Sequence, residues 1–500
     1  MRMKVLKELI AIIRPNLSDS LNGNIRALYE AIRQDKITTE EEGAALFFKD
    51  QQHQYKYFNK LKNDLKKILR NQLLVAPLIK STSEAEKVFD ECHKAIVEVK
   101  LLVKRNSYKE AINIAKLYLD QAKKYDLHLV AFLLAEELQY YSALHKGQII
   151  EAKKYDIIAK EQLELSRLQN KLRAYYAVIG SKLNSSRNIS EEFQIQLNEY
   201  YQESKEYLKF NSANLRVFVY SIAIFRHYSY FDYPQIVQTC QEANSFFLQS
   251  KYPERRHSFL YQIVPALIVL NRYKEARTNI NSAIEIAIKT NGTVNWSICN
   301  YYSLVLSFYE GKYQKAYEFY HAVKKHSDKI YKSLGEDWLI IKAYLSFFIK
   351  IGKIETDSQD YFKLGQFLNE LPIASKDKAG NYINVLIVQI LHLIISKKGT
   401  LIDSIEAFEK FISRHLKDPT LLRAKIFLSM LLSVPKHNFH RVAVLRKTEK
   451  WQKKLQATPA RMGQNLEIEI VPYEALWELV LDNLQDKFVG KLKRNRVGHS

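Results

Sequence analysis

The segments Asn106-Ser107-Tyr108-Lys109-Glu110-Ala111 and Asn271-Arg272-Tyr273-Lys274-Glu275-Ala276 are two copies of the motif that decides the fold of this chain. Close variants occupy residues 147–152 and 311–316, each beginning with Gly and ending with Ala. The initial Asn or Gly can adopt the left-handed conformation that ends a helix. The aromatic or aliphatic residue two positions later packs where the next helix begins. The motif therefore predicts the turn of a helical hairpin.

The third residue of the motif, called the marker below, recurs at a nearly constant interval. The nine markers are Tyr108, Ile149, Ile189, Tyr233, Tyr273, Tyr313, Ile354, Ile402 and Phe439. Their residue numbers differ successively by 41, 40, 44, 40, 40, 41, 48 and 37. A period of about 20–50 residues is typical of a solenoid, in which each hairpin has an apolar flank that only the next hairpin covers. The sequence thus predicts an all-α fold, an α–α superhelix or solenoid of about nine helical hairpins.

Apolar residues at helical spacing support the hairpin around the first marker. The helix after the turn carries Ala111, Ile112, Ala115, Leu119 and Ala122, and the helix before it carries Ile96, Val99, Leu102 and Val103. The whole chain of 500 residues contains only 14 glycines and 10 prolines. Because β-rich and doubly wound folds need more of both in their loops, this shortage favours helices joined by short connections.

Several features indicate the cellular setting. The three cysteines lie far apart and form no CxxC pair, so we interpret them as reduced core residues. The apolar run near the N-terminus is interrupted by Lys7 and Glu8, unlike that of a signal peptide. No stretch of 18 uncharged apolar residues occurs, which argues against a membrane partner. We expect a cytoplasmic protein.

The motif resembles the middle section of the tetratricopeptide repeat (TPR), and Ala283 and Gly180 stand where that family often has small residues. The resemblance covers about residues 88–455, with four good copies and five degenerate ones. The step of about 40 residues exceeds the 34 of the family, and the proline that usually ends a unit is missing. The resemblance implies a TPR-like array that recognises a peptide or a partner helix through side chains of the first helix of each hairpin.

The two ends of the chain depart from the repeat, so four regions are expected: a helical domain over 1–86, the solenoid over 87–455, a cap over 456–486 and a basic tail over 487–500. Helices are predicted at 3–13, 22–34, 39–49 and 52–74. The last has an apolar stripe on one face and Lys56, Lys60, Lys62, Lys66, Lys67 and Arg70 on the other. The domain either caps the solenoid or resembles a helix-turn-helix module. In the second case Lys56, Lys60, Lys67 and Arg70 would neutralise phosphates, and Gln54 or Asn63 would reach base edges.

Near the C-terminus, residues 466–471 alternate apolar and acidic side chains, which favours a short strand or an extended arm. A capping helix is predicted at 473–489. The tail then carries five basic side chains and no acidic one; they are Lys487, Lys491, Lys493, Arg494 and Arg496. Such a tail binds anions weakly.

No established catalytic or cofactor motif is present, so we predict a non-enzymatic protein with no catalytic, cofactor or metal site. His437 and His440 could share a helix face, but no further ligand lies near them in sequence. The carboxylate pairs Glu136/Glu137 and Glu467/Glu469 are interpreted as solvated.

The formal charge of 76 − 54 = +22 favours anionic partners, although a general lysine bias would produce the same count. Tyrosine doublets recur, and on a helix one member can pack while the other faces a groove. We therefore predict a protein-binding scaffold that holds an acidic protein or peptide in a concave groove. The groove candidates are Tyr140, Tyr176, Arg226 and Tyr302. The alternative is a nucleic-acid-binding regulator that uses the N-terminal basic helix, and self-association is left open.

Overall fold

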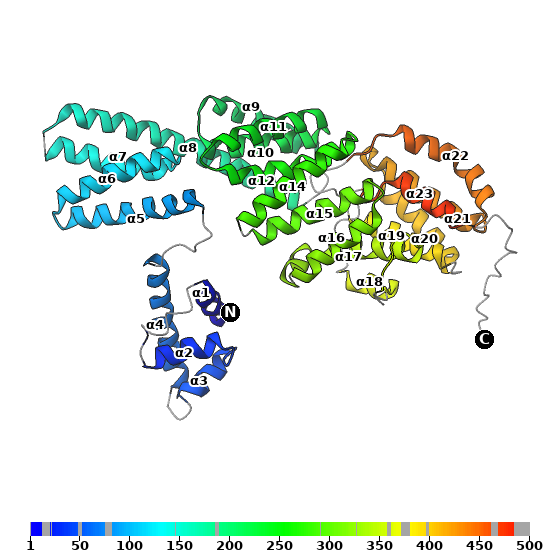
Figure 1. The fold of residues 1–500 in the computed structure, drawn as a ribbon, viewed down its shortest axis with the longest axis horizontal. Coiled ribbons are helices and arrows are strands. Elements are labelled where there is room, and N and C mark those ends of the chain that lie inside the picture. The colour runs from blue at the N-terminus through cyan, green and yellow to red at the C-terminus, as the bar shows by residue number, and fades with distance from the viewer. Residues whose placement is uncertain are drawn as a thin grey trace. The chain divides into compact units, whose positions relative to one another are not determined.

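The computed structural model describes residues 2–12, 21, 23–48, 53–75, 83–145, 147–185, 190–290, 292–326, 328–357, 362–371, 381–396, 400–461 and 469–484. Within these ranges the chain forms α-helices and short 3-10 helices, and no β-strand occurs. Helices that follow one another in the chain pack side by side (Figure 1). The predicted all-α solenoid is confirmed. None of the described helices is both long and apolar enough to cross a bilayer.

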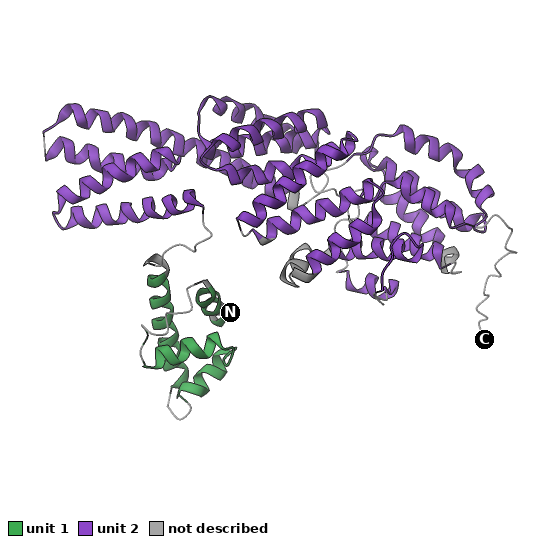
Figure 2. Cartoon of the chain, viewed as in Figure 1, with its two compact units in different colours: residues 1–82 green, residues 83–500 purple. Residues whose placement is uncertain are grey.

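The chain divides into two compact units, residues 1–82 and 83–500 (Figure 2). Helix α5 (Glu84–Lys104) begins just after the division. A full capping box fixes this start, because Ser83 Oγ accepts from the Glu86 amide and a Glu86 carboxylate oxygen accepts from the Ser83 amide. The predicted boundary at residue 86 therefore falls inside the first turn of α5.

Unit 1 consists of α1 (Arg2–Ile12), α2 (Gly23–Arg33), α3 (Glu40–Phe48) and α4 (Gln54–Val75), in agreement with the four predicted helices. The start of α3 is capped as the sequence indicates: Thr39 Oγ1 accepts from the Glu42 amide at 3.2 Å, and Glu42 Oε2 accepts from the Thr39 amide at 3.1 Å. The predicted apolar stripe of α4 is buried or nearly so; it comprises Phe58, Leu61, Leu65, Ile68 and Leu69. Unit 1 therefore has a hydrophobic core of its own.

The solenoid of unit 2 continues from α5 through helices that pack mainly on their neighbours in sequence. They are α6 (Tyr108–Lys124), α7 (His128–Leu144), α8 (Ile149–Ser185), α9 (Glu191–Lys205), α10 (Ala213–Ser229), α11 (Tyr233–Gln249), α12 (Arg256–Gln262), α13 (Val264–Val269), α14 (Tyr273–Lys289), α15 (Thr293–Tyr309), α16 (Tyr313–His326), α17 (Asp328–Lys350), α18 (Leu364–Glu370), α19 (Asn381–Ile395), α20 (Thr400–His415), α21 (Leu422–Lys436), α22 (Arg441–Ala457) and α23 (Tyr473–Asp482).

The hairpin turns follow the register that the motif predicts. Five markers are the first residue of a helix; they are Tyr108, Ile149, Tyr233, Tyr273 and Tyr313. The residue two positions before each has a positive φ, including 59° at Asn106, 56° at Asn271 and 69° at Gly311. In four of these turns the amide of the following residue donates to a carbonyl five residues back, as from Ser107 to Leu102 at 2.9 Å, and after Gly147 the Gln148 amide donates to Ser142, six residues back. The four turns are thus Schellman motifs, as expected for a helix end with a left-handed residue.

Three markers depart from this pattern, and a fourth, Ile189, lies outside the described residues. Ile354 follows a left-handed Gly352, but the next helix, α18, begins only at Leu364. Ile402 lies inside α20, and Phe439 precedes α22 by two residues. Helix α8, of 37 residues, fills the 40-residue interval after Ile149. The two widest intervals, before Tyr233 and after Ile354, hold α9 with α10 and α18 with α19.

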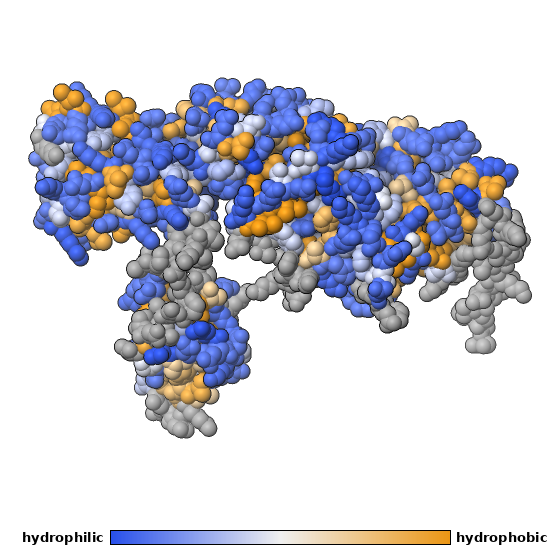
Figure 3. Space-filling view, in the orientation of Figure 1, coloured by the Kyte–Doolittle hydropathy of each residue, from blue (hydrophilic) through white to orange (hydrophobic). Residues whose placement is uncertain are grey.

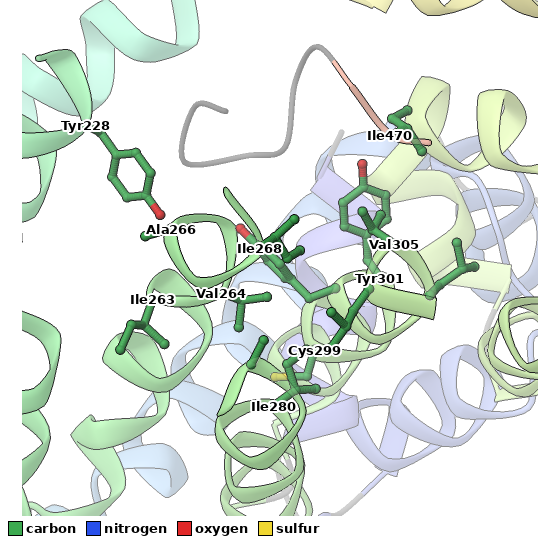
Figure 4. Packing of buried hydrophobic residues seen from close by; sticks show 14 of the residues in the cluster. Tyr228, Ile263, Val264, Ala266, Ile268, Ile280, Cys299, Tyr301, Val305 and Ile470 are labelled. Carbon is green, nitrogen blue, oxygen red and sulfur yellow. The ribbon is translucent and has the colours of Figure 1, made fainter. Parts of the chain in front are cut away.

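A large core runs through unit 2, and a second, smaller cluster joins α8, α9 and α10. The motif alanines of the well-formed copies are almost entirely buried, and Ala111, Ala276 and Ala316 have no exposed surface. Figure 4 shows part of this core, where Ile263, Val264 and Ala266 lie near Ile280 of α14 and Cys299 of α15. All three cysteines are free and buried, in agreement with the core role predicted for them.

The C-terminal part of the chain is held by a buried ion pair. The Arg423 guanidinium on α21 donates to Glu469 at 2.8 and 2.9 Å and to Glu474 at 2.8 Å. Tyr309 OH donates to the Glu469 carbonyl at 2.6 Å, which ties the same segment to α15. Glu469 is only 3% exposed, so the prediction that it is solvated is wrong. The sequence misled because the pairing cation lies 46 residues away. Residues 485–500, including the basic tail, lie outside the described residues.

Candidate functional site: the joint pocket

Polar contacts between segments far apart in sequence join the start of α10 and the turn before α12 to helices α6, α7 and α8. Helix α8 packs along α7 and then against α10. The turn between α6 and α7 meets the start of α10 and the short 3-10 helix Pro253–Arg255 that precedes α12. We call this meeting point the joint.

Asp126 is the centre of the joint. It has a φ of 52° and ends α6 in the same left-handed conformation as the motif turns. Its Oδ2 accepts from the Ala213 amide at 2.7 Å, and its carbonyl accepts from Asn214 Nδ2 at 2.7 Å. Burial raises the pKa of the Asp126 carboxyl, while the hydrogen bond from Ala213 opposes that rise. The carboxylate caps the first turn of α10 from 87 residues away.

His128 and Tyr252 complete the joint. Nδ1 of His128 donates to Gln162 Oε1 on α8 at 2.9 Å, and Ser212 Oγ donates to His128 Nε2 at 2.9 Å. Tyr252 OH donates to the carbonyl of Tyr125, and the two rings meet edge to face. Buried polar networks fix one geometry when every member is satisfied. The joint is therefore a rigid base for the cavity beside it.

A pocket of about 550 Å³ opens at the joint, and we call it the joint pocket. Its apolar lining is accessible, because Phe89 of α5 is 48% exposed and Leu129 of α7 is 56% exposed. Its polar lining includes Arg173 of α8, Asn214 of α10 and Arg255. The pocket thus combines apolar contact area with a few hydrogen-bonding groups, the usual composition of a ligand site.

Arg255 is the most unusual group in the pocket wall. Its guanidinium lies 3.8 Å from the centre of the Tyr252 ring, and burial lowers its pKa. Its Nη1 is covered but has no hydrogen-bond partner among the described residues. A covered donor without an acceptor costs roughly 1–3 kcal/mol. The Arg255 side chain as a whole is partly exposed, so a ligand in the pocket can contact it.

A second hollow of about 420 Å³ shares Asp126 and Tyr252 with the joint pocket. Lys123, Lys124 and Lys251 line it, and all three are exposed. The described acidic residue in its lining is Asp126, whose carboxylate already accepts from Ala213. The surroundings of the joint are therefore basic on this side.

Tyr140 and Tyr176 are exposed, at 63% and 41%, but they lie on separate parts of unit 2. Gln139 donates to Asp156 at 3.2 Å, which sets the register of α7 on α8. Tyr176 lies further along α8 from Asp156 by about 30 Å, at a rise of 1.5 Å per residue. The ring of Tyr176 packs against α10 instead.

Arg226 and Tyr302 are held within the protein. Arg226 donates to Asn198 Oδ1 at 3.3 Å, and its guanidinium lies over the rings of Tyr201 and Tyr230. Tyr302 is 4% exposed, and its neighbour Tyr301 is 9% exposed, so neither member of this doublet faces a groove as predicted. The four groove candidates do not form one surface, and none of them lines the joint pocket.

The basic residues of α4 lie mostly where the sequence places them. Lys56, Lys60, Lys67 and Arg70 are exposed. Lys62 is the exception: it is 4% exposed and pairs with Glu40 of α3 at 2.7 Å. The sequence does not distinguish Lys62 from the exposed lysines around it, because its partner Glu40 lies on another helix.

Sequence reasoning did not identify Asp126, His128 or Arg255. The available signal was weak: an Asp-Leu-His sequence after an amphipathic helix indicates a turn and nothing more. Of the two histidines that could share a helix face, His440 has a structural role, because its Nδ1 accepts from the Ala443 amide and caps α22.

No protein-family model, curated protein or solved structure matches this chain.

Proposed function

We propose that the chain is a cytoplasmic, non-enzymatic interaction scaffold, a TPR-like solenoid that holds an acidic segment of a partner protein in the joint pocket. The observation that carries this proposal is the pocket's mixed lining. It combines the accessible side chains of Phe89 and Leu129 with the partly exposed guanidinium side chain of Arg255. The TPR-like relation is supported by the left-handed residues two positions before the markers.

The wall suits a segment that pairs an apolar side chain with an acidic one. Burying a leucine or phenylalanine of the partner contributes roughly 1.5–3 kcal/mol. A carboxylate can accept two parallel hydrogen bonds from a guanidinium. Of the acidic residues in the wall, Glu86 caps α5 and Asp126 caps α10, whereas Glu254 stays beside Arg255. Arg173 and Arg255 supply the cationic groups of the lining.

Selection from a random-peptide phage library on the full chain tests this proposal, with Leu129→Arg as the variant that obstructs the pocket. We expect enriched peptides to contain an acidic residue next to an apolar one and to bind Leu129→Arg at least tenfold more weakly. Leu117→Arg is the matched control, because Leu117 is 58% exposed on α6 and lies outside the pocket lining. Enriched peptides that bind both variants equally, or no enrichment at all, would contradict the proposal.

A further inference from the structure

Helix α4 of unit 1 carries a continuous basic face that the scaffold proposal does not use. Its members, all exposed, are Lys56, Lys60, Lys66, Lys67 and Arg70, and we call them the basic stripe. With 3.6 residues per turn, they fall within an arc of about 120° directly opposite the buried apolar residues of α4. The stripe extends over about 21 Å at 1.5 Å per residue.

The charges of the basic stripe are not neutralised by unit 1. None of its five side chains forms an ion pair with an acidic residue in the described part of the chain, whereas Lys62 on the same helix pairs with Glu40. Asp64 is exposed at the margin of the stripe, and Asn63 lies within it. Such a row of like charges raises the local potential and attracts a polyanion.

The surroundings of the stripe identify the kind of polyanion. A helix inserts into a lipid surface through an accessible apolar face, but that face of α4 is buried in the core of unit 1 through Phe58, Leu65 and Leu69. A protein partner is held mainly by apolar and aromatic side chains in a desolvated centre. The stripe contains no large apolar side chain, and only Tyr55 and Tyr57 lie beside it, about half exposed. A ligand recognised through its charge alone remains.

We propose that the basic stripe of α4 binds the phosphate backbone of duplex DNA. A helix of this length with an exposed basic face fits the major groove, which admits an α-helix. The five cations contact phosphates, and Asn63 in the middle of the row faces the base edges, where asparagine pairs with adenine. A single strand fits less well, because proteins bind it in a groove with stacked rings.

Fluorescence anisotropy of the full chain with a labelled 20-base-pair duplex, measured over a series of salt concentrations, tests this inference. We expect the affinity to fall steeply with salt, with each phosphate contact adding about −0.9 to the slope of log K against log[salt]. The double substitution Lys60→Gln/Lys67→Gln should make the slope shallower by roughly 2. The matched control is Lys447→Gln/Lys450→Gln, which removes the same charge from exposed positions on α22.

The outcomes separate a specific surface from general attraction to a chain of charge +22. Equal slopes for the two double variants would overturn the inference, as would tighter binding of the single strand than of the duplex. Lysine acetylation with and without DNA gives an independent readout. We expect Lys56, Lys60 and Lys67 to be protected by the duplex and Lys447 to stay reactive, and the reverse would also overturn the inference.

Discussion

The turns at Asn106 and Asp126 share one backbone conformation but use their side chains differently. Their φ angles are 59° and 52°, and in each the next amide donates to a carbonyl five residues back, at 2.9 and 2.8 Å. Asn106 Oδ1 accepts from Tyr108 OH at 3.0 Å, within the turn itself. Asp126 Oδ2 accepts from the Ala213 amide, 87 residues away. The same local device thus ends a repeat in one place and joins distant repeats in the other.

The difference separates two kinds of stabilisation in unit 2. In a solenoid, stability is approximately a sum over units and their neighbour interfaces. The motif turns stabilise single helical hairpins, while the joint and the Arg423–Glu469 pair connect segments that are not neighbours in sequence. Apolar side chains remain exposed beside the joint, and Figure 3 shows apolar patches over α5–α7 among hydrophilic surface. Under the proposed function, a partner would bury the most apolar surface beside the joint, where long-range hydrogen bonds fix the pocket lining.

The largest effect is expected when a long-range tie is broken at the buried ion pair. Glu469→Ala should lower the free energy of unfolding by about 3–5 kcal/mol, because it leaves part of the Arg423 charge buried and unpaired. Glu474→Ala is the control, since its carboxylate is 35% exposed and water can replace it. Urea denaturation measures the loss, and hydrogen exchange should locate it in α21–α23. Equal losses in the two variants would show that the tie at Glu469 is not special.

A second long-range tie is sensitive to pH. Nε2 of His392 donates to the Ala343 carbonyl at 3.0 Å, and Lys350 Nζ donates to Nδ1 at 3.2 Å, an arrangement that only the neutral ring allows. Burial, with Lys350 nearby, lowers the pKa of His392 from 6.5 to about 4. Between these values the unfolded chain binds more protons, so stability falls as the pH is lowered through this window. The contribution is roughly 3 kcal/mol at 1.36 kcal/mol per pKa unit.

Urea denaturation of wild type and His392→Gln at pH 7 and pH 4.5 tests this contribution. The amide of glutamine can keep both hydrogen bonds but does not titrate, so the variant should lose less stability on acidification than the wild type. His145→Gln at the exposed end of α7 is the control and should behave like the wild type. An unchanged loss in His392→Gln would contradict the role assigned to this ring.

The comparison also explains which parts of the fold the sequence could predict. The turn at Asn106 depends on residues within one motif, so the period and the register of five markers could be predicted from the sequence. The helices of unit 1 could be predicted from their own local patterns of apolar and capping residues. Glu469, Tyr302 and the joint depend on partners from distant helices, which periodicity does not identify. The groove candidates do not come together, because α8 continues for 37 residues without the turn that the repeat predicts. A repeated motif predicts which helices pack beside each other in sequence order, whereas the joint pocket is formed by residues that lie far apart in the sequence.

The smallest and sharpest effect comes from making the same substitution in both turns. Glycine adopts a positive φ without cost, so Asn106→Gly should change the free energy of unfolding by only a few tenths of a kcal/mol. Asp126→Gly keeps the backbone but removes the acceptor of the Ala213 amide at the first residue of α10, and should cost about 1–2 kcal/mol. Hydrogen exchange should show faster opening at the start of α10 for Asp126→Gly alone. If both variants were equally stable, the joint would be held by His128 and Tyr252, and Asp126 would be only another helix end.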